Sequence, residues 1–427
     1  MSGRLFNLGL RIASLGSRFL LAVLLAKSMR VEDFGFYGLF AAALTYLVYV
    51  VGLDFYTYNV RDLVTRPMST WRPLLRDQCL IYSMTFALVS ACAFSFWVAG
   101  VISGKTLIWL LLLLASEHMA QELNRLLIIS GKVLQSSIAL FIRSGLWVLI
   151  LAVLWMTNPN TPLQLYQVFS LWLCSSILAI VLSLWCMRSF LTDDNINVPV
   201  DWVRLRTGIR VSAIFFVGTL MLKLSSSADR FLVEYFVDLS AVGPYVLYAG
   251  LAGAIVALVD AAVVVYDYPG LIRAWQAGDE QQFQSLYRAF LRRVMLYALA
   301  IATVLAVSLN PVLDFIDKQE VLEAWPLAIP LILANVLLAL ANVPHYALYA
   351  AGQDRTILTA TIISTTVFLL AAIMMGPMLG TTAIAWSFFL SSLAVLLSKA
   401  TLWRNIRRKH TWTITSLQFN QLSHTTT

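Results

Sequence analysis

The sequence predicts an all-α polytopic membrane protein with about 12 transmembrane helices in two pseudo-symmetric six-helix lobes around a central cavity. Three observations lead to this fold class. Of the 427 residues, 60% are hydrophobic and only 12% are charged, and the mean hydropathy of +0.79 lies far from the balance of a soluble domain. Apolar stretches long enough to cross a bilayer recur along the whole chain. A cationic motif heads each half of the sequence.

The first apolar stretch, residues 5–29, is too long for a signal-peptide core and lacks a small-residue cleavage site, so we interpret it as the first span. The fourth span is the least regular, because Glu117, His118, Glu122 and Arg125 interrupt it. The twelve predicted spans are residues 5–29, 34–58, 77–101, 106–129, 133–156, 163–187, 208–236, 241–266, 290–313, 325–350, 356–376 and 380–402.

The positions of the basic residues predict the orientation of these spans. With a cytoplasmic N-terminus, 21 of the 30 Lys and Arg residues fall in inner segments, 4 fall in outer loops and 5 fall inside spans. This bias predicts that both termini are cytoplasmic. Because topology accounts for most of the +8 net charge, no nucleic-acid partner is needed to explain it.

The spans divide evenly at a polar linker. We predict an N-terminal six-helix lobe at 1–190, a cytoplasmic linker at 191–206, a C-terminal six-helix lobe at 207–404 and a cytoplasmic tail at 405–427. Since six spans return the chain to its starting side, the lobes enter the membrane in the same orientation, as parallel repeats do. Before the ninth span, residues 274–293 have the pattern of an amphipathic surface helix.

The cationic motif places two charges on one helix face in each lobe. Arg11 precedes the run Arg18-Phe19-Leu20 by seven residues, and Lys223 precedes Arg230-Phe231-Leu232 by the same distance. Seven residues make about two helical turns. Charged residues within spans are costly and mark functional positions. A looser match pairs Gly35-Phe36-Tyr37, at the start of the second span, with Gly243-Pro244-Tyr245, at the start of the eighth.

The N-terminal third resembles the Wzx-type O-antigen flippases of the multidrug/oligosaccharidyl-lipid/polysaccharide exporter superfamily. The resemblance rests on Arg18-Phe19-Leu20 with Lys27, residues 33–40 (DFGFYGLF), residues 52–56 (GLDFY) and Arg61. It implies that the protein flips an undecaprenyl-pyrophosphate-linked oligosaccharide from the inner to the outer leaflet of the bacterial inner membrane. Expected partners are this lipid-linked oligosaccharide, membrane lipids, a polysaccharide polymerase and assembly proteins.

A pyrophosphate head group needs compensating cations inside the lobes. The candidates are the five basic residues within spans: Arg11, Arg18, Arg143, Lys223 and Arg230. Each has a structural alternative, namely neutralisation by a neighbour or snorkelling to the membrane surface. Arg11 lies near enough to the predicted inner surface to snorkel, and Glu234 follows Arg230 by one turn.

Carboxylates within spans are the candidates for ion coupling, which the resemblance implies. Asp260 stands alone in a run of Ala, Val and Leu, and Asp229 is the second candidate. We expect Asp54 and Arg61 to form a gate contact or a structural pair. For Glu122 and Arg125, which are three residues apart, we expect a satisfied ion pair.

Three other functions fit the composition, and one of them is a generic lipid-phosphate flippase with another head group, which is the hardest to exclude. A multidrug extruder of the same superfamily would need an acidic or apolar cavity for cationic drugs, whereas the repeated motif is basic. A membrane-bound oligosaccharide polymerase or acyltransferase would need a long external loop or converging catalytic residues, and the sequence offers neither. We therefore expect no enzyme activity and no cofactor. The four cysteines and four histidines are scattered, so we expect no disulfide and no metal site.

Overall fold

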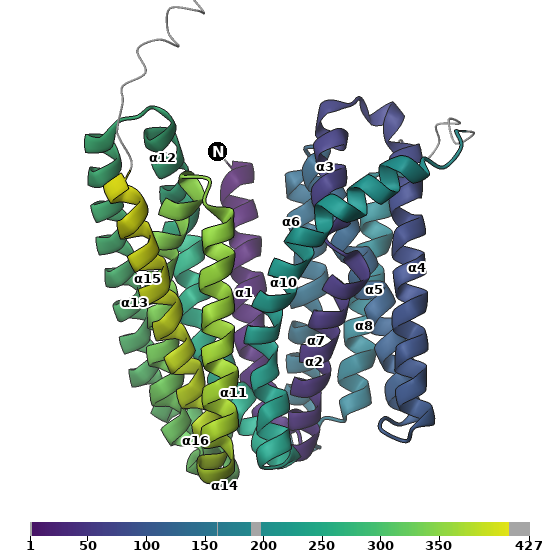
Figure 1. Cartoon of the computed structure of the whole chain (residues 1–427). Coiled ribbons are helices and arrows are strands. Elements are labelled where there is room, and N and C mark those ends of the chain that lie inside the picture. Colours follow the sequence, from purple (N-terminus) through teal and green to yellow (C-terminus); the bar gives the residue numbers. More distant parts are fainter. Residues whose placement is uncertain (1, 160, 189–197, 410–427) are drawn as a thin grey trace, which may run out of the picture. The chain divides into compact units, whose positions relative to one another are not determined.

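The computed structural model describes residues 2–159, 161–188 and 198–409; the side chains of residues 2–8, 11, 214, 222, 225, 226 and 409 lie outside the description. The described chain is built of helices and contains no strand. It divides into two compact units, residues 1–247 and 248–427. Each unit is described by itself below, following the colours of Figure 1.

The first unit contains seven long helical segments at the positions of the first seven predicted spans. They are α1 (Ser2–Ser28), α2 (Val31–Gly52), α4 (Trp71–Val98), α5 (Gly104–Ile129), the continuous pair α6 (Val133–Phe141) and α7 (Trp147–Thr157), α8 (Leu165–Cys186) and α10 (Trp202–Phe236). The short helix α3 (Phe55–Thr65) and the 3₁₀ turn η1 (Met68–Thr70) join α2 to α4. A π-helical turn, η2 (Ile142–Leu146), joins α6 to α7. Figure 1 shows α2 and α10 running side by side, and the two helices pack together.

The remaining crossings begin with α11 (Leu239–Val259), which starts in the first unit and runs through the π-helical turn η3 (Asp260–Val264) into α12 (Val265–Gln276). α13 (Glu280–Ile316), α14 (Gln319–Glu323), the turn η4 (Trp325–Leu327), α15 (Ala328–Ala350) and α16 (Asp354–Lys409) follow. α16 is two helices joined at a kink, because Gly380 has a positive φ of 55°. With this kink counted as a break, the described residues contain twelve long helical segments at the positions of the predicted spans. Eight of the described helices, with α16 counted once, are long and apolar enough to cross a membrane, and the all-α polytopic fold class is confirmed.

The second crossing is shorter than the sequence predicts. We expected it to continue to residue 58, but α2 ends at Gly52. Leu53 and Asp54 both adopt left-handed backbone conformations, with φ of 46° and 50°, and α3 starts directly after them. Apolar content cannot reveal this break, since non-glycine residues seldom adopt positive φ. The surrounding fold holds Phe55 and Asp54 in the interior, where they are 0% and 5% exposed.

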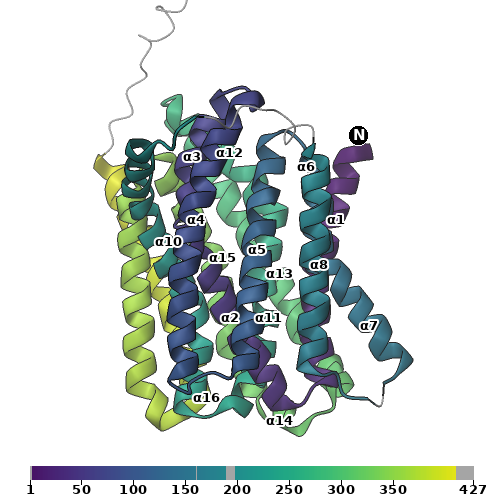
Figure 2. The same ribbon diagram turned by 90° about the vertical axis from the view of Figure 1, so that its right-hand side faces the viewer.

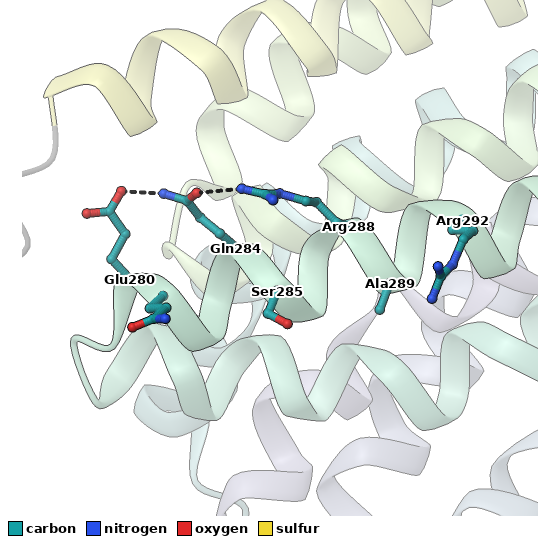
Figure 3. Close-up of a pocket in the computed structure, with 7 residues that line it drawn as sticks. Glu280, Gln284, Ser285, Arg288, Ala289 and Arg292 are labelled. Atoms are coloured by element: carbon teal, nitrogen blue, oxygen red, sulfur yellow. Dashed lines mark hydrogen bonds between the residues drawn. The ribbon is translucent and has the colours of Figure 1, made fainter.

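The stretch at 274–293 is also divided differently from the prediction. Its first residues complete α12 and a turn at Gly278, and the helix begins at Glu280, where the Asp279 carboxylate accepts the Gln282 N–H at 2.8 Å. The helix then runs without interruption into the ninth crossing. Its polar face carries a ladder in which Gln284 donates to Glu280 and Arg288 donates to Gln284 (Figure 3).

The two glycines of the looser repeat lie against each other in the first unit. A Cβ atom on Gly35 of α2 would stand 2.2 Å from the Leu239 carbonyl oxygen, and one on Gly243 of α11 would stand 2.8 Å from the Val31 carbonyl oxygen. Only glycine permits this backbone approach. The predicted lobe boundaries stay a prediction, because the compact units divide within α11 and part of the linker, residues 189–197, lies outside the described residues.

Candidate functional site

The cations of the second motif copy lie on the face of α10 that packs against α2. The Lys223 Nζ atom stands over the Tyr49 ring, 4.7 Å from its centroid. Two helical turns further on, Arg230 lines a cavity of about 260 Å³ together with Ser227, Tyr37, Thr45 and others. The predicted common face is therefore present: both cations meet aromatic side chains of one neighbouring helix.

No carboxylate forms an ion pair with Arg230 in the described chain. Its Nε atom is buried and has no hydrogen-bond partner. Glu234, which the sequence offers as a partner one turn away, is exposed and makes no ion pair with it. Asp229 is adjacent in sequence, but its oxygens accept the Tyr245 hydroxyl at 2.9 Å and the Arg230 backbone N–H at 2.9 Å. The Arg230 guanidinium therefore keeps hydrogen-bonding capacity toward the cavity.

The first motif copy approaches the same place from α1. Tyr37 lies on α2 and lines the cavity with Arg230, and the charged groups of Arg18 and Glu117 lie near enough to influence its hydroxyl. Arg18 itself is exposed, while its neighbours Ser14 and Ser17 are buried and donate to backbone carbonyls one turn back. The side chain of Arg11 lies outside the described residues, so its predicted role has no structural counterpart.

Arg143 has a different environment, because a carboxylate on α5 neutralises it. Two of its nitrogens donate to Glu117 Oε2, at 2.9 and 2.6 Å. The other oxygen of Glu117 accepts the indole N–H of Trp172 at 3.0 Å and the Ser176 hydroxyl at 2.5 Å, both on α8. The π-helical turn η2 carries Arg143 toward this cluster. The structural alternative considered for Arg143, neutralisation by a neighbour, is what the structure contains.

A second buried network joins α3, α4 and α5. Arg125 donates to Glu122, as expected for this pair, and its guanidinium also lies over the Tyr56 ring, 3.5 Å from the centroid. The other oxygen of Glu122 accepts from Gln78 at 2.9 Å and from the Tyr82 hydroxyl at 3.0 Å. These contacts satisfy Glu122 almost entirely within the protein.

Asp54 and Arg61 do not pair in the described chain. Asp54 is buried with its Oδ2 atom lacking a hydrogen-bond partner, and Arg61 is exposed on α3. Asp54 lies in the left-handed turn at residues 53–54, and Arg61 lies on the helix α3 that follows this turn. Their seven-residue spacing therefore does not place them on one helix face.

The two proposed coupling carboxylates lie in different settings. Asp229 is held by Tyr245 as described, whereas Asp260 begins the π-helical turn η3 and accepts the Asn342 side-chain N–H of α15 at 2.7 Å. Asp260 has no cationic partner among the described residues. Within the described ranges, no group of three or more His, Cys, Asp or Glu side chains could hold a metal ion.

Sequence reasoning missed the partners from helices distant in sequence. In the sequence, Glu117 is only one of the polar residues that interrupt the fourth predicted span, and nothing local indicates that Arg143, 26 residues later, reaches it. Tyr37 and Tyr49 were two among 16 tyrosines. The available signal was weak: Thr45 follows Tyr37 by eight residues and Tyr49 follows Thr45 by four, and each of these spacings keeps two neighbours on adjoining parts of the α2 surface.

The fold was compared with known proteins. No family model matches the sequence, and no curated protein matches it. An inward-facing multidrug resistance MATE family transporter of the MOP superfamily matches over 93% of this chain and 96% of its own, with a TM-score of 0.71 and 12% identity. The lipid II flippase MurJ, in an inward closed conformation, matches over 92% and 87%, with a TM-score of 0.70 and 14% identity. The chain has the fold of these transporters. An outward-facing MATE structure matches with a TM-score of 0.56, at 13% identity over 92% of both chains.

Proposed function

We propose that this membrane protein flips an undecaprenyl-pyrophosphate-linked oligosaccharide from the inner to the outer leaflet of the bacterial inner membrane by alternating access. The observation that carries the proposal is the α10 face, where Lys223 and Arg230 meet tyrosines of α2 and Arg230 has no carboxylate partner within the described residues. A diphosphate brings two or more negative charges and needs such cations in a low-dielectric interior.

Each basic residue has a separate role in this proposal. Arg230 offers forked donors to phosphate oxygens, and Lys223 adds a compact positive charge two turns away. Tyr37 and Tyr49 provide flat ring faces for a sugar-bearing head group. Arg18 adds a third positive charge that acts on Tyr37. Arg143 pairs with Glu117, which also accepts the Ser176 hydroxyl, so this cluster links α5, η2 and α8.

Transport against a gradient requires coupling to an ion, and Asp260 remains the first candidate. Its one side-chain contact in the described chain is to neutral Asn342, so protonation would cost it no ion pair. Asp229 is the second candidate, and its carboxylate accepts the Tyr245 hydroxyl.

The second candidate function is extrusion of cationic drugs, which the likeness to MATE transporters favours. The two functions predict opposite charge preferences. Drug extrusion would use buried carboxylates such as Asp229 as the binding groups, and it would gain from removal of Arg230.

The experiment that separates them is transport by the purified protein in proteoliposomes. A fluorescent undecaprenyl-pyrophosphate oligosaccharide should become accessible to an external reagent faster than in protein-free vesicles. A cationic dye should not be transported. Accelerated dye transport, lost in Asp229→Asn and kept in Arg230→Ala, would replace the flippase proposal with extrusion. An imposed pH gradient with Asp260→Asn tests the coupling separately.

A further inference from the structure

A groove of about 560 Å³ lies between α4, α5 and α8, away from the cations of α10. Its lining extends along α4 from Arg72 to Phe86. At 1.5 Å per residue, this stretch is about 21 Å long, roughly half the thickness of a bilayer with its head groups. Figure 2 shows α4, α5 and α8 side by side on the face toward the viewer, and α5 packs against both neighbours. The α4–α5–α8 groove therefore has the length of one membrane leaflet.

The groove is open at its side and apolar along its walls. Cys79, Ser83 and Met119 line it and are exposed. Gln78, Tyr82 and Glu122 also line it, but they direct their hydrogen bonds to one another. Along most of its length, the groove therefore offers a ligand only hydrocarbon surface. Its volume is usual for small-molecule sites.

Positive charge gathers at one end of the groove, in the first two turns of α4. Arg76 is held by Asp77 at 2.7 Å. Arg72 lines the groove, is partly buried and makes no hydrogen bond or ion pair with the described residues. A second unsatisfied group lies deeper: His118 is only 8% exposed, and its Nε2 atom has no partner. Buried polar atoms without partners are uncommon, and a polar group that entered the groove would satisfy this one.

We propose that this groove binds one anionic glycerophospholipid, with the phosphate at Arg72 and one acyl chain between α4, α5 and α8. The ligand charge follows from the protein charge. One uncompensated arginine matches a phosphodiester with a single negative charge, whereas a pyrophosphate would need further cations. Basic pockets between transmembrane helices are suited to anionic lipid head groups. This lipid site does not depend on the transported substrate.

The first test counts retained lipid on the full-length protein by native mass spectrometry. Palmitoyl-oleoyl phosphatidylglycerol should be retained as one molecule, and phosphatidylcholine with the same chains should be lost. Arg72→Gln should weaken phosphatidylglycerol binding about fivefold, the effect expected from removing one surface cation. Arg66→Gln is the matched control, because Arg66 is exposed and lies outside the groove. Equal retention of both lipids, or equal loss in both variants, would overturn the proposal.

The second test locates the chain and guards against misfolding of the Arg72 variant. Phosphatidylglycerol carrying a diazirine in one acyl chain should crosslink to the peptides of Cys79 and Met119 rather than to the region of Cys92, which lies on α4 beyond the groove. Ser83→Phe should fill the groove and abolish these adducts, because the Ser83 hydroxyl bonds only its own helix. Adducts that persist in Ser83→Phe, or that undecaprenyl phosphate competes away better than phosphatidylglycerol does, would exclude a phospholipid site here.

Discussion

Arg143 and Arg230 are both arginines inside membrane-spanning helices of the first unit, yet their surroundings differ. Arg143 donates two hydrogen bonds to Glu117, whose second oxygen is held by Trp172 and Ser176. Arg230 has a buried Nε atom without a partner and lines a cavity. The protein neutralises the Arg143 guanidinium, whereas the Arg230 guanidinium has no carboxylate partner among the described residues.

The difference shows that a charged residue within a membrane span costs free energy in either case, but its presence alone does not reveal whether its role is structural or functional. A neutralised pair fixes helices in place, and breaking it leaves a buried charge. A cation that lines a cavity can instead meet an anion that arrives from outside. The comparison therefore separates structural from functional arginines, and the predictions below test it from the largest expected effect to the smallest.

Substitution in the Arg143 cluster should have the largest effect, and we expect that effect on the stability of the fold. Glu117→Ala leaves Arg143 buried without its counter-ion, so we expect a loss of about 3 kcal/mol in the free energy of unfolding. Thermal unfolding in detergent measures it. The double variant Glu117→Leu with Arg143→Met should recover much of the loss. If Glu117→Ala unfolds like the wild type, the pair is not structural.

Substitution of Arg230 should instead lower the rate of transport. Charge-assisted hydrogen bonds contribute about 1.5–3 kcal/mol, so Arg230→Ala should slow flipping of the lipid-linked oligosaccharide about tenfold to a hundredfold, with little change in melting temperature. Thr45→Val in the same cavity is the control, because its hydroxyl already donates to the Ala41 carbonyl at 2.8 Å. A wild-type rate in Arg230→Ala would remove this residue from the site.

Lys223 should have a smaller effect on the same rate. Its ammonium lies over Tyr49 and acts on a phosphate as a point charge, so Lys223→Ala should reduce flipping about fivefold. Lys223→Arg should retain most of the activity. Tyr49→Phe should leave the rate nearly unchanged, since the ring face and not the hydroxyl meets the cation. An equal loss in Lys223→Arg and Lys223→Ala would show that position, rather than charge, matters.

Asp238, between α10 and α11, should have the smallest effect. The Ser240 hydroxyl and the Ala241 N–H donate to its carboxylate and hold its pKa below the usual 3.8. The ionised form therefore stabilises the fold above pH 3.8, and this contribution is lost as the pH falls through the lower folded-state pKa. Asp238→Asn should cost about 0.5 kcal/mol at pH 7, and flipping should be unchanged. A constant stability difference down to acid pH would contradict this cause.

The helices themselves could be predicted because each crossing is a local property. A run of about twenty apolar residues satisfies its backbone hydrogen bonds within one helix, whatever surrounds it. The twelve crossings, the break near Gly380 and the pair of Glu122 with Arg125 all follow from short stretches of sequence. The end of α2 at Gly52 does not, because packing imposes the left-handed turn there.

The sequence by itself determined which residues carry charge into the membrane and that Lys223 and Arg230 share a helix face. Only the tertiary structure decided what each charge meets, because its partners come from other helices. Glu117 reaches Arg143 across 26 residues, and Tyr37 and Tyr49 face α10 from nearly 200 residues away. Helical periodicity fixes the direction of a side chain relative to its own axis, and packing alone fixes the neighbour that it finds.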